Sequence, residues 1–421
     1  MIMILKNISE EEFSNFYENF EQKCFWQSVS MAHFESSHGW SIHYLGFYDE
    51  DVIRAATVLI SKKVTGKYAL FEALRGFLID YDDLDLMDVF LNELKIYLHA
   101  HNCLYMKIDP YCEYQPHDKD GNAIEGYRRD DLIDLFEKHG FIHQGFRNGS
   151  DNNYEPRWMS ILPLEGKDEE NILKKCDSKT RQNIVNTQKT GLKIDRLNKS
   201  ELYRLHDMVS TTGKRRHFLN PDLSYYTDFM TSFHENMQAY CVYLDTKDYY
   251  ERYRKNYEEL IKEKEHIYKL IEETDSKKNR SKLKNCENKI TAALKRIDEA
   301  KKLREEYGDK IDLAAAMYVI TDREIVYLFS GSNDTFKHFK AAYALQWYMI
   351  KYGIEHHIKR YNFYGISGIF SPEDEEYGVY LFKKGFDADV IELIGNFEYI
   401  DRKRTYTVYE DLRRIKHLVR K

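Results

Sequence analysis

Apolar and polar positions alternate along the first third of the chain with two different periods. A two-residue period predicts β-strands, and a period near 3.6 residues predicts amphipathic helices. These periods predict a hairpin of strands 43–48 and 52–61, a helix over 84–100 and a strand over 103–109. Residues 1 to about 145 are therefore predicted to form one mixed unit of helices and strands.

The same alternation returns in two later segments, 146–245 and 311–395. Together these segments predict a second αβ unit, although the amino-acid sequence contains no clear internal repeat. The expected strands are 158–163, 192–196, 314–321, 324–329 and 360–364, and the expected helices are 169–190, 199–209 and 336–352.

Residues 246–310 have a different pattern, because apolar or aromatic positions recur every three or four residues on both sides of a central break. This heptad spacing predicts an antiparallel two-helix coiled coil, about 40 Å long at about 1.5 Å per residue. The segment holds 19 Lys/Arg and 15 Asp/Glu. The positions that form the expected seam are Tyr253, Tyr257, Leu260, Lys264, Ile267, Ile271, Leu283, Cys286, Ile290, Ala293, Ile297, Ala300 and Leu303.

The expected turn of this hairpin, residues 276–284, is basic and contains no acid. Such a segment is either a solvated charged surface or a tip that contacts a phosphate backbone. No base-reading motif accompanies it, so sequence-specific recognition is not predicted. The basic residues are Lys277, Lys278, Arg280, Lys282 and Lys284.

Composition limits the class of protein. The chain has 421 residues, 43% hydrophobic residues and a net charge of −7, which predicts two or three folded domains without a global basic field. The six cysteines form no CxxC pair and fit free thiols in a reducing compartment. The N-terminus turns polar too early for a signal peptide, and no apolar run approaches about 18 residues. We therefore expect a cytoplasmic protein.

The common cofactor motifs are missing from the sequence. It contains no GxxxxGK[ST] phosphate loop, no GxGxxG after a strand, no HExxH and no GxSxG elbow. The [R/Q]xxGx[G/A] loop that binds the pyrophosphate of acyl-CoA is also absent. We therefore expect neither a metal nor a cofactor.

One lysine stands out in the C-terminal quarter. Lys383 lies between Phe382 and Phe386, where neighbouring rings would reduce its hydration and strengthen its charge in an adjacent cleft. Such a cation suits an enzyme that neutralises an anion or an oxyanion. The alternative is a solvated pair of Lys383 and Lys384 at a strand edge.

Several segments in this order resemble the FemABX family of peptidyltransferases, which build the interpeptide bridges of peptidoglycan. The resemblance runs nearly end to end. The residues that carry it are Arg75–Tyr81, Leu104–Tyr111, Gly331–Asn333, Leu345–Trp347, Arg360–Gly365 and Phe382–Phe386.

The resemblance implies an α/β (α+β) fold with two tandem acyltransferase domains of GNAT type. The first would comprise residues 1–145 plus about 396–421, and the second 146–245 plus 311–395. The coiled-coil arm, 246–310, would interrupt the second domain, as it does in FemA-like and MurM-like members.

The implied reaction transfers an amino acid from aminoacyl-tRNA to an amine on the stem peptide of a peptidoglycan precursor. The precursor would be lipid-linked or UDP-linked, and the amino acid would be small (Gly, Ala or Ser). A lipid-linked acceptor would bring the protein into peripheral contact with the inner membrane surface. Related bridge-forming transferases are further expected partners.

The resemblance also implies roles for individual residues. Lys383 matches the family lysine of the catalytic cleft, and Phe382 would pack beside the substrate. Asp109 matches an acid proposed to handle the amine proton, with a structural alternative in which it only caps its loop. The remaining substrate-binding candidates are Lys214, Arg215, Tyr226, Tyr364 and Tyr327.

Two departures from the family pattern concern the acceptor. Pro221 stands where many members have an arginine, and the segment around Glu35 lacks a lysine found in some soluble-precursor enzymes. Both departures are compatible with a membrane-bound lipid acceptor. Two other functions also stay open, namely an acyl-CoA-dependent N-acyltransferase on the same fold and a non-catalytic protein that recruits partners through its coiled coil.

Overall fold

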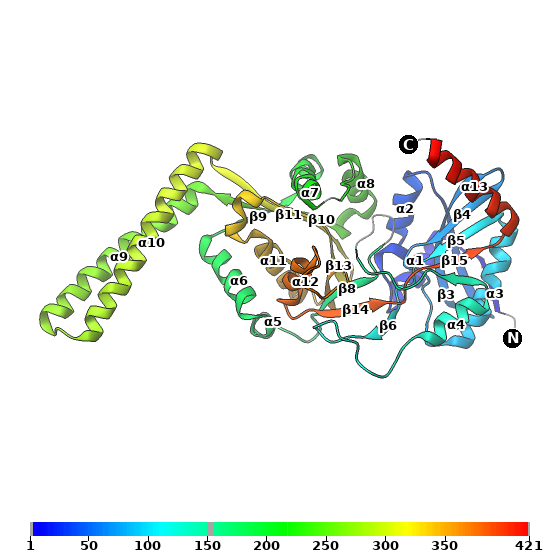
Figure 1. Ribbon diagram of the computed structural model, residues 1–421, viewed down its shortest axis with the longest axis horizontal. Helices are drawn as coiled ribbons and strands as arrows, with labels where there is room; N and C mark the ends of the chain where they lie inside the picture. The colour runs from blue at the N-terminus through cyan, green and yellow to red at the C-terminus, as the bar shows by residue number, and fades with distance from the viewer. Residues whose placement is uncertain (1–2, 150–154, 217, 420–421) are drawn as a thin grey trace.

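Two β-sheets lie side by side, and a long helical arm projects from the far end of the second sheet (Figure 1). The computed structural model describes residues 3–149, 155–216 and 218–419, and in the last helix it describes side chains as far as Ile415. Both ends of the described chain lie beside the first sheet.

The first sheet has seven strands in the order β1-β2-β3-β4-β5-β15-β7. Only β4 and β5 pair in parallel, and helices cover both faces. The strands are β1 (Met3–Asn7), β2 (Ser41–Asp49), β3 (Val52–Thr65), β4 (Tyr68–Ala73), β5 (Cys103–Ile108), β15 (Phe397–Ile400) and β7 (Phe141–His143). The helices are α1 (Glu10–Asn19), α2 (Val29–Ser37), α3 (Leu84–Ala100), α4 (Asp130–Lys138) and α13 (Lys403–Val419).

The second sheet has eight strands in the order β6-β14-β8-β13-β12-β11-β10-β9. Its first edge strand, β6, comes from the N-terminal part of the chain, so the two sheets share one continuous segment. The strands are β6 (Glu113–Pro116), β14 (Asp389–Leu393), β8 (Trp158–Pro163), β13 (Arg360–Ile366), β12 (Glu324–Ser332), β11 (Lys310–Ile320), β10 (Met237–Asp245) and β9 (Lys193–Leu197).

Helices cover both faces of the second sheet. One buried cluster joins α6 and α11 to one face, and another joins α7 and α8 to the opposite face. The helices are α5 (Glu169–Lys175), α6 (Ser178–Thr190), α7 (Leu202–Arg216), α8 (Leu223–Phe233), α11 (Ala341–Glu355) and α12 (Tyr377–Lys384).

The predicted hairpin, the helix over 84–100 and the strand over 158–163 are confirmed. The single helix predicted over 169–190 is wrong. The chain breaks at Cys176, and the carboxylate of Asp177 accepts a hydrogen bond from the backbone N–H of Thr180 (2.6 Å), which caps a new helix, α6. The helix predicted over 336–352 also divides, because Lys340 adopts a left-handed backbone (φ 58°) before α11 begins.

The arm consists of two antiparallel helices, α9 (Thr246–Glu273) and α10 (Lys277–Tyr307). Their buried seam includes Leu260, Ile267 and Ala293 at the predicted heptad positions. The predicted turn over 276–284 is wrong, because Ser276 caps α10 and the connection is only residues 274–276.

Candidate functional site

Lys383 occupies the last turn of α12, and the alternative of a strand edge is wrong. Its side chain is buried, with 5% exposure. The ammonium donates hydrogen bonds to the carbonyl oxygens of Tyr364 (3.2 Å) and Gly365. Burial lowers the pKa of Lys383 to about 7. The predicted desolvation is therefore confirmed, whereas the neighbouring Lys384 forms an ion pair with Asp120.

The two phenylalanines that flank this lysine in the sequence pack against each other and against α11. Phe382 and Phe386 form an edge-to-face pair, with 5.5 Å between ring centroids. Phe382 also meets Tyr343 of α11 at 4.9 Å. These contacts hold α12 against the second sheet and fix the direction in which Lys383 points.

The end of β13 supplies the carbonyl oxygens that contact Lys383. Tyr364 has a left-handed backbone (φ 66°), which is uncommon for a side chain of this size. Its backbone N–H donates to the buried amide oxygen of Asn362 (2.8 Å). That short contact stabilises the bend which turns the Tyr364 carbonyl toward α12.

Arg75 and Asp109 form a buried ion pair where the two sheets meet. The backbone N–H of Arg75 donates to Asp109 (2.8 Å), and the guanidinium Nε lies 3.4 Å from the same carboxylate. Another guanidinium nitrogen donates to the carbonyl of Pro156 (2.7 Å). Glu155, which precedes Pro156, accepts a hydrogen bond from the Tyr364 hydroxyl. A series of contacts therefore runs from Asp109 through Arg75 and residues 155–156 to β13, whose carbonyl oxygens accept hydrogen bonds from Lys383.

A cavity of about 230 Å³ beside this network has four acids and one lysine among its eleven lining residues, and we call it the acidic cavity. Burial raises the pKa of Glu72, Asp109 and Glu155 above their ordinary values. Carboxylates in such surroundings are stabilised by a cation that enters the cavity. The lining residues are Glu72, Ala73, Leu74, Lys107, Ile108, Asp109, Gln144, Glu155, Asn396, Phe397 and Glu398.

Lys214 and Arg215 lie in the last turn of α7, and both side chains are exposed. Arg215 forms an ion pair with Asp334, which follows β12. This close packing depends on Gly331, because a Cβ there would come within 2.2 Å of the Met208 backbone in α7. The structure thus fixes these two cations beside the end of β12.

The two remaining aromatic candidates are less accessible. Tyr226 has no exposed surface, and its hydroxyl donates to Asn220 (2.5 Å). It therefore stabilises the connection between α7 and α8 from within the core. Tyr327 packs against Tyr318 at 5.5 Å in the core shared with Phe382. Neither lines the acidic cavity among the described residues.

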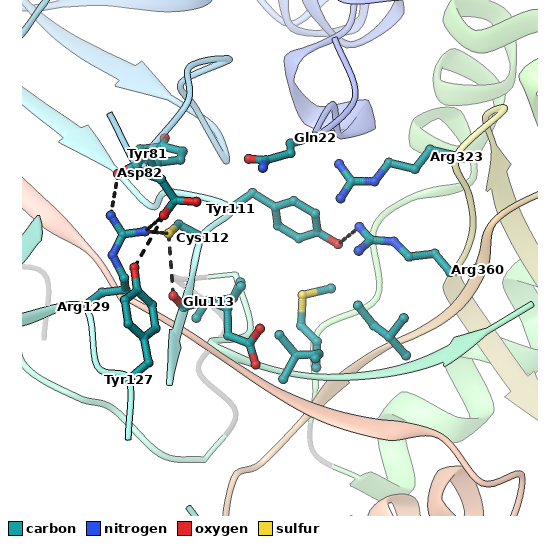
Figure 2. Close-up of a pocket in the computed structure, with 14 residues that line it drawn as sticks. Gln22, Tyr81, Asp82, Tyr111, Cys112, Glu113, Tyr127, Arg129, Arg323 and Arg360 are labelled. Carbon is teal, nitrogen blue, oxygen red and sulfur yellow. Dashed lines mark hydrogen bonds and ion pairs between the residues drawn. The ribbon is translucent and has the colours of Figure 1, made fainter. Parts of the chain in front are cut away.

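A second cavity, of about 330 Å³, lies between the sheets and is lined by arginine and tyrosine at its ends (Figure 2). Arg360 donates to Tyr111 (3.1 Å) and pairs with Glu324 (2.8 Å). The Asn362 amide donates to the same tyrosine (3.2 Å) and glutamate (3.3 Å). Asn362, which stabilises the bend of β13, is therefore held in place by Tyr111 of this cavity and by Glu324.

The basic residues of the arm are exposed at its tip, far from both cavities. Arg280 is paired with Asp275, which immediately precedes the basic segment 276–284. The four lysines have no ion pair within the part of the chain that the structure describes. They are Lys277, Lys278, Lys282 and Lys284.

Sequence reasoning missed the groups that surround Asp109. Arg75 and Asn362 are predicted only as members of family-like segments, and the sequence predicts no role for Glu72 or Glu155. Glu72 could have been identified from the sequence, because the alternating pattern of β4 places it on the less buried face of that strand. Glu155 could not, since only the folded chain brings it to Tyr364, 209 residues away.

Among residues 3–149, 155–216 and 218–419, no helix is both long and apolar enough to cross a bilayer. Within the same residues, no group of three or more His, Cys, Asp or Glu side chains is arranged to hold a metal ion.

Comparisons with known proteins extend over nearly the whole chain. A model of the FemAB family matches residues 8–414. Aminoacyltransferase FemA of Staphylococcus epidermidis is 33% identical over 416 residues, which is 98% of this chain and 100% of that protein. The protein of the same name from Staphylococcus aureus strain MRSA252 is 32% identical, with 98% and 99% covered.

Among solved structures, the crystal structure of FemX matches with a TM-score of 0.80 at 24% identity, covering 96% of this chain and 99% of that one. This match confirms the predicted two-domain architecture. The family match and the curated relatives confirm the predicted relationship, and the chain belongs to the FemAB family.

Proposed function

We propose that this chain transfers an amino acid from aminoacyl-tRNA to an amine on the stem peptide of a peptidoglycan precursor, and so extends an interpeptide bridge. The chain is an aminoacyltransferase, as its FemA relatives are named. The observation that carries the proposal is the buried Lys383 ammonium, which lies at the bend of β13 and donates to the carbonyl oxygens of Tyr364 and Gly365. The transferred residue would be small, namely Gly, Ala or Ser.

The chemistry requires no further activation. The ester that joins the amino acid to tRNA is already reactive, so the acceptor nitrogen can attack its carbonyl carbon directly. The new C–N bond gives a tetrahedral oxyanion, which the Lys383 ammonium would stabilise. The C–O bond to the ribose then breaks, and one proton passes from the nitrogen to the leaving ribose oxygen. The other proton must leave the ammonium before the attack, to expose the nitrogen lone pair, and Asp109 would accept it.

The acidic cavity would hold the acceptor amine. An alkylamine has a pKa near 10.4 and arrives as a cation at neutral pH. Glu72, Asp109 and Glu155 would attract that cation, and their raised pKa values favour proton uptake from it. Arg75 keeps the charge of Asp109 in place through their ion pair.

The remaining candidates would bind the rest of the substrates. Lys214 and Arg215 would contact the precursor's pyrophosphate, with Tyr226 supporting them from behind. Phe382, Tyr364 and Tyr327 would form the wall beside the peptide. A lipid-linked precursor fits the lack of a lysine near Glu35, although a UDP-linked one has the same pyrophosphate.

The direct test is an in vitro transfer assay. Purified protein is incubated with a panel of radiolabelled aminoacyl-tRNAs and with either lipid-linked or UDP-linked precursor. We expect label to move from one small-amino-acid tRNA into one precursor class. If no tRNA donates, and titration shows that acetyl-CoA binds, the chain is an acyl-CoA-dependent enzyme. If neither occurs, it is a binding protein.

The lowered pKa of Lys383 gives a pH prediction. The ammonium loses its proton as pH rises through about 7, so its contribution to kcat should decrease above that pH. The ratio of kcat for the wild type to kcat for Lys383→Met should be constant below about pH 6, fall as pH rises through about 7, and approach one at high pH. Taking the ratio removes the titration of the acceptor amine, which is common to both proteins. A ratio that stays constant up to pH 10 would show that the charge of Lys383 is not used.

The arm gives a second prediction. Changing Lys277, Lys278, Arg280, Lys282 and Lys284 to Gln should weaken tRNA binding and flatten its dependence on salt, because fewer counterions are released. Filter binding between about 50 and 300 mM salt (about a sixfold range of ionic strength) measures both effects. A variant with Lys262, Lys269 and Lys295 of the arm's shaft changed to Gln is the control. Binding isotherms that match the wild type at every salt concentration would exclude the tip from tRNA binding.

A further inference from the structure

As far as Ile415, helix α13 half-buries its tyrosines against the first sheet and exposes its aliphatic side chains. The Tyr406 ring packs on buried Tyr105 of β5, with 5.0 Å between centroids, and its hydroxyl donates to Glu398 of β15 (2.7 Å). Val408, Leu412 and Ile415 are 59%, 54% and 55% exposed. A helix that packs on one sheet normally turns its aliphatic residues toward that sheet. This helix therefore has a second, uncovered apolar face.

The three exposed residues are contiguous on the helix surface. Their spacing of four and then three residues brings them onto one side within two turns. In Figure 1, α13 lies across the outside of the first sheet, away from the arm and from the second sheet. No other described element covers this face, so it is accessible to a large partner.

The segment that carries this face is basic in sequence. Residues 403–421 contain seven Lys/Arg and two Asp/Glu, in a chain whose net charge is −7. Two nearby arginines already have acidic partners, Arg402 with Asp401 and Arg413 with Glu410. At the start of the helix, the cations of Lys67 and Arg402 lie 5.7 and 6.0 Å from the ring centre of Tyr68. The cationic residues therefore continue from the helix onto the β3–β4 turn.

We propose that α13 lies on an anionic lipid bilayer, with Val408, Leu412 and Ile415 inserted among the lipid chains and the flanking cations at the headgroup phosphates. A basic helix with one exposed aliphatic stripe has the composition of helices that lie in the membrane interface. Charge complementarity favours anionic lipid over a second copy of the chain, because two such basic helices repel each other. The proposal goes beyond the transfer reaction, since it assigns a surface that contains no residue of the site.

Vesicle flotation tests the proposal without measuring transfer. The full chain is mixed with vesicles of phosphatidylcholine alone or with an equal part of phosphatidylglycerol. We expect binding only to the second kind, and at least tenfold weaker binding in high salt. The double variant Leu412→Ser/Ile415→Ser should lose at least tenfold in binding. Ile96→Ser on α3, where the side chain is 61% exposed, should bind as the wild type does.

Either of two results would overturn the proposal. One is that the wild type fails to float with phosphatidylglycerol vesicles at low salt. The other is that the double variant floats equally well. Sedimentation of the same proteins without lipid identifies the competing occupant, because a dimer that the double variant abolishes would assign this face to self-association. If the wild-type protein floats with these vesicles but transfers no amino acid, the proposed reaction is wrong and the membrane proposal stands.

Discussion

Lys383→Met should lower kcat by at least about tenfold, equivalent to about 1.4 kcal/mol of activation free energy, with a smaller change in the acceptor's KM. Methionine has a similar length and fills the same buried space between α12 and β13, but it carries no charge for the oxyanion. Single-turnover transfer from radiolabelled aminoacyl-tRNA to saturating precursor measures the chemical step. Because the carbonyls of Tyr364 and Gly365 lose their donor, thermal unfolding should be recorded for the same preparation.

The neighbouring residue gives a matched control. Lys384 lies on the same helix, but its ammonium points outward to Asp120. Lys384→Met should therefore keep kcat within about twofold, since surface ion pairs contribute little. If both variants turn over at the wild-type rate, Lys383 has no part in the chemical step, and its burial is structural only.

Arg75→Met should lower the free energy of unfolding by about 3–5 kcal/mol, the usual effect of removing one partner from a buried ion pair. Arg75 is 3% exposed, and Asp109 has no other cation in an ion pair within the described chain. The variant also removes the guanidinium hydrogen bond to Pro156. Urea unfolding at neutral pH, followed by circular dichroism, measures the change.

A double-mutant cycle separates the ion pair from the loss of packing. The double variant Arg75→Met/Asp109→Leu should lose much less unfolding free energy than the sum of the losses in the two single variants, because no unpaired buried charge remains. Arg54→Met, at a half-exposed arginine near Asp49, should change stability by less than about 1 kcal/mol. Strictly additive effects of the two buried substitutions would mean that the pair is not coupled.

The sequence predicted the parts of this protein that depend on local pattern. Helix 84–100 and strand 158–163 follow from apolar spacing, and the burial of Lys383 follows from the rings on either side of it. The break at Cys176 was missed because periodicity continues across it, while the cap at Asp177 is a single side-chain contact. The short helix α12 was missed because it has only eight residues and includes Gly378.

The acidic cavity could not be predicted in the same way. Its walls come from β4, β5, the segment before β8 and the segment around β15. The strand order of the first sheet makes β4, β5 and β15 neighbours, and only the folded chain adds the segment before β8. Asp109 was found through a family motif, whereas Glu155 and Asn362 act through tertiary contacts that leave no periodic signal.

The placement of β15 affects how the protein is made. This strand lies inside the first sheet, between β5 and β7, yet it is synthesised more than 250 residues after either of them. The N-terminal half must therefore wait on the ribosome with an unfilled gap between two of its strands until translation is nearly finished. Premature termination just before residue 397 would leave both strand edges open, so incomplete chains should be poorly soluble and prone to degradation.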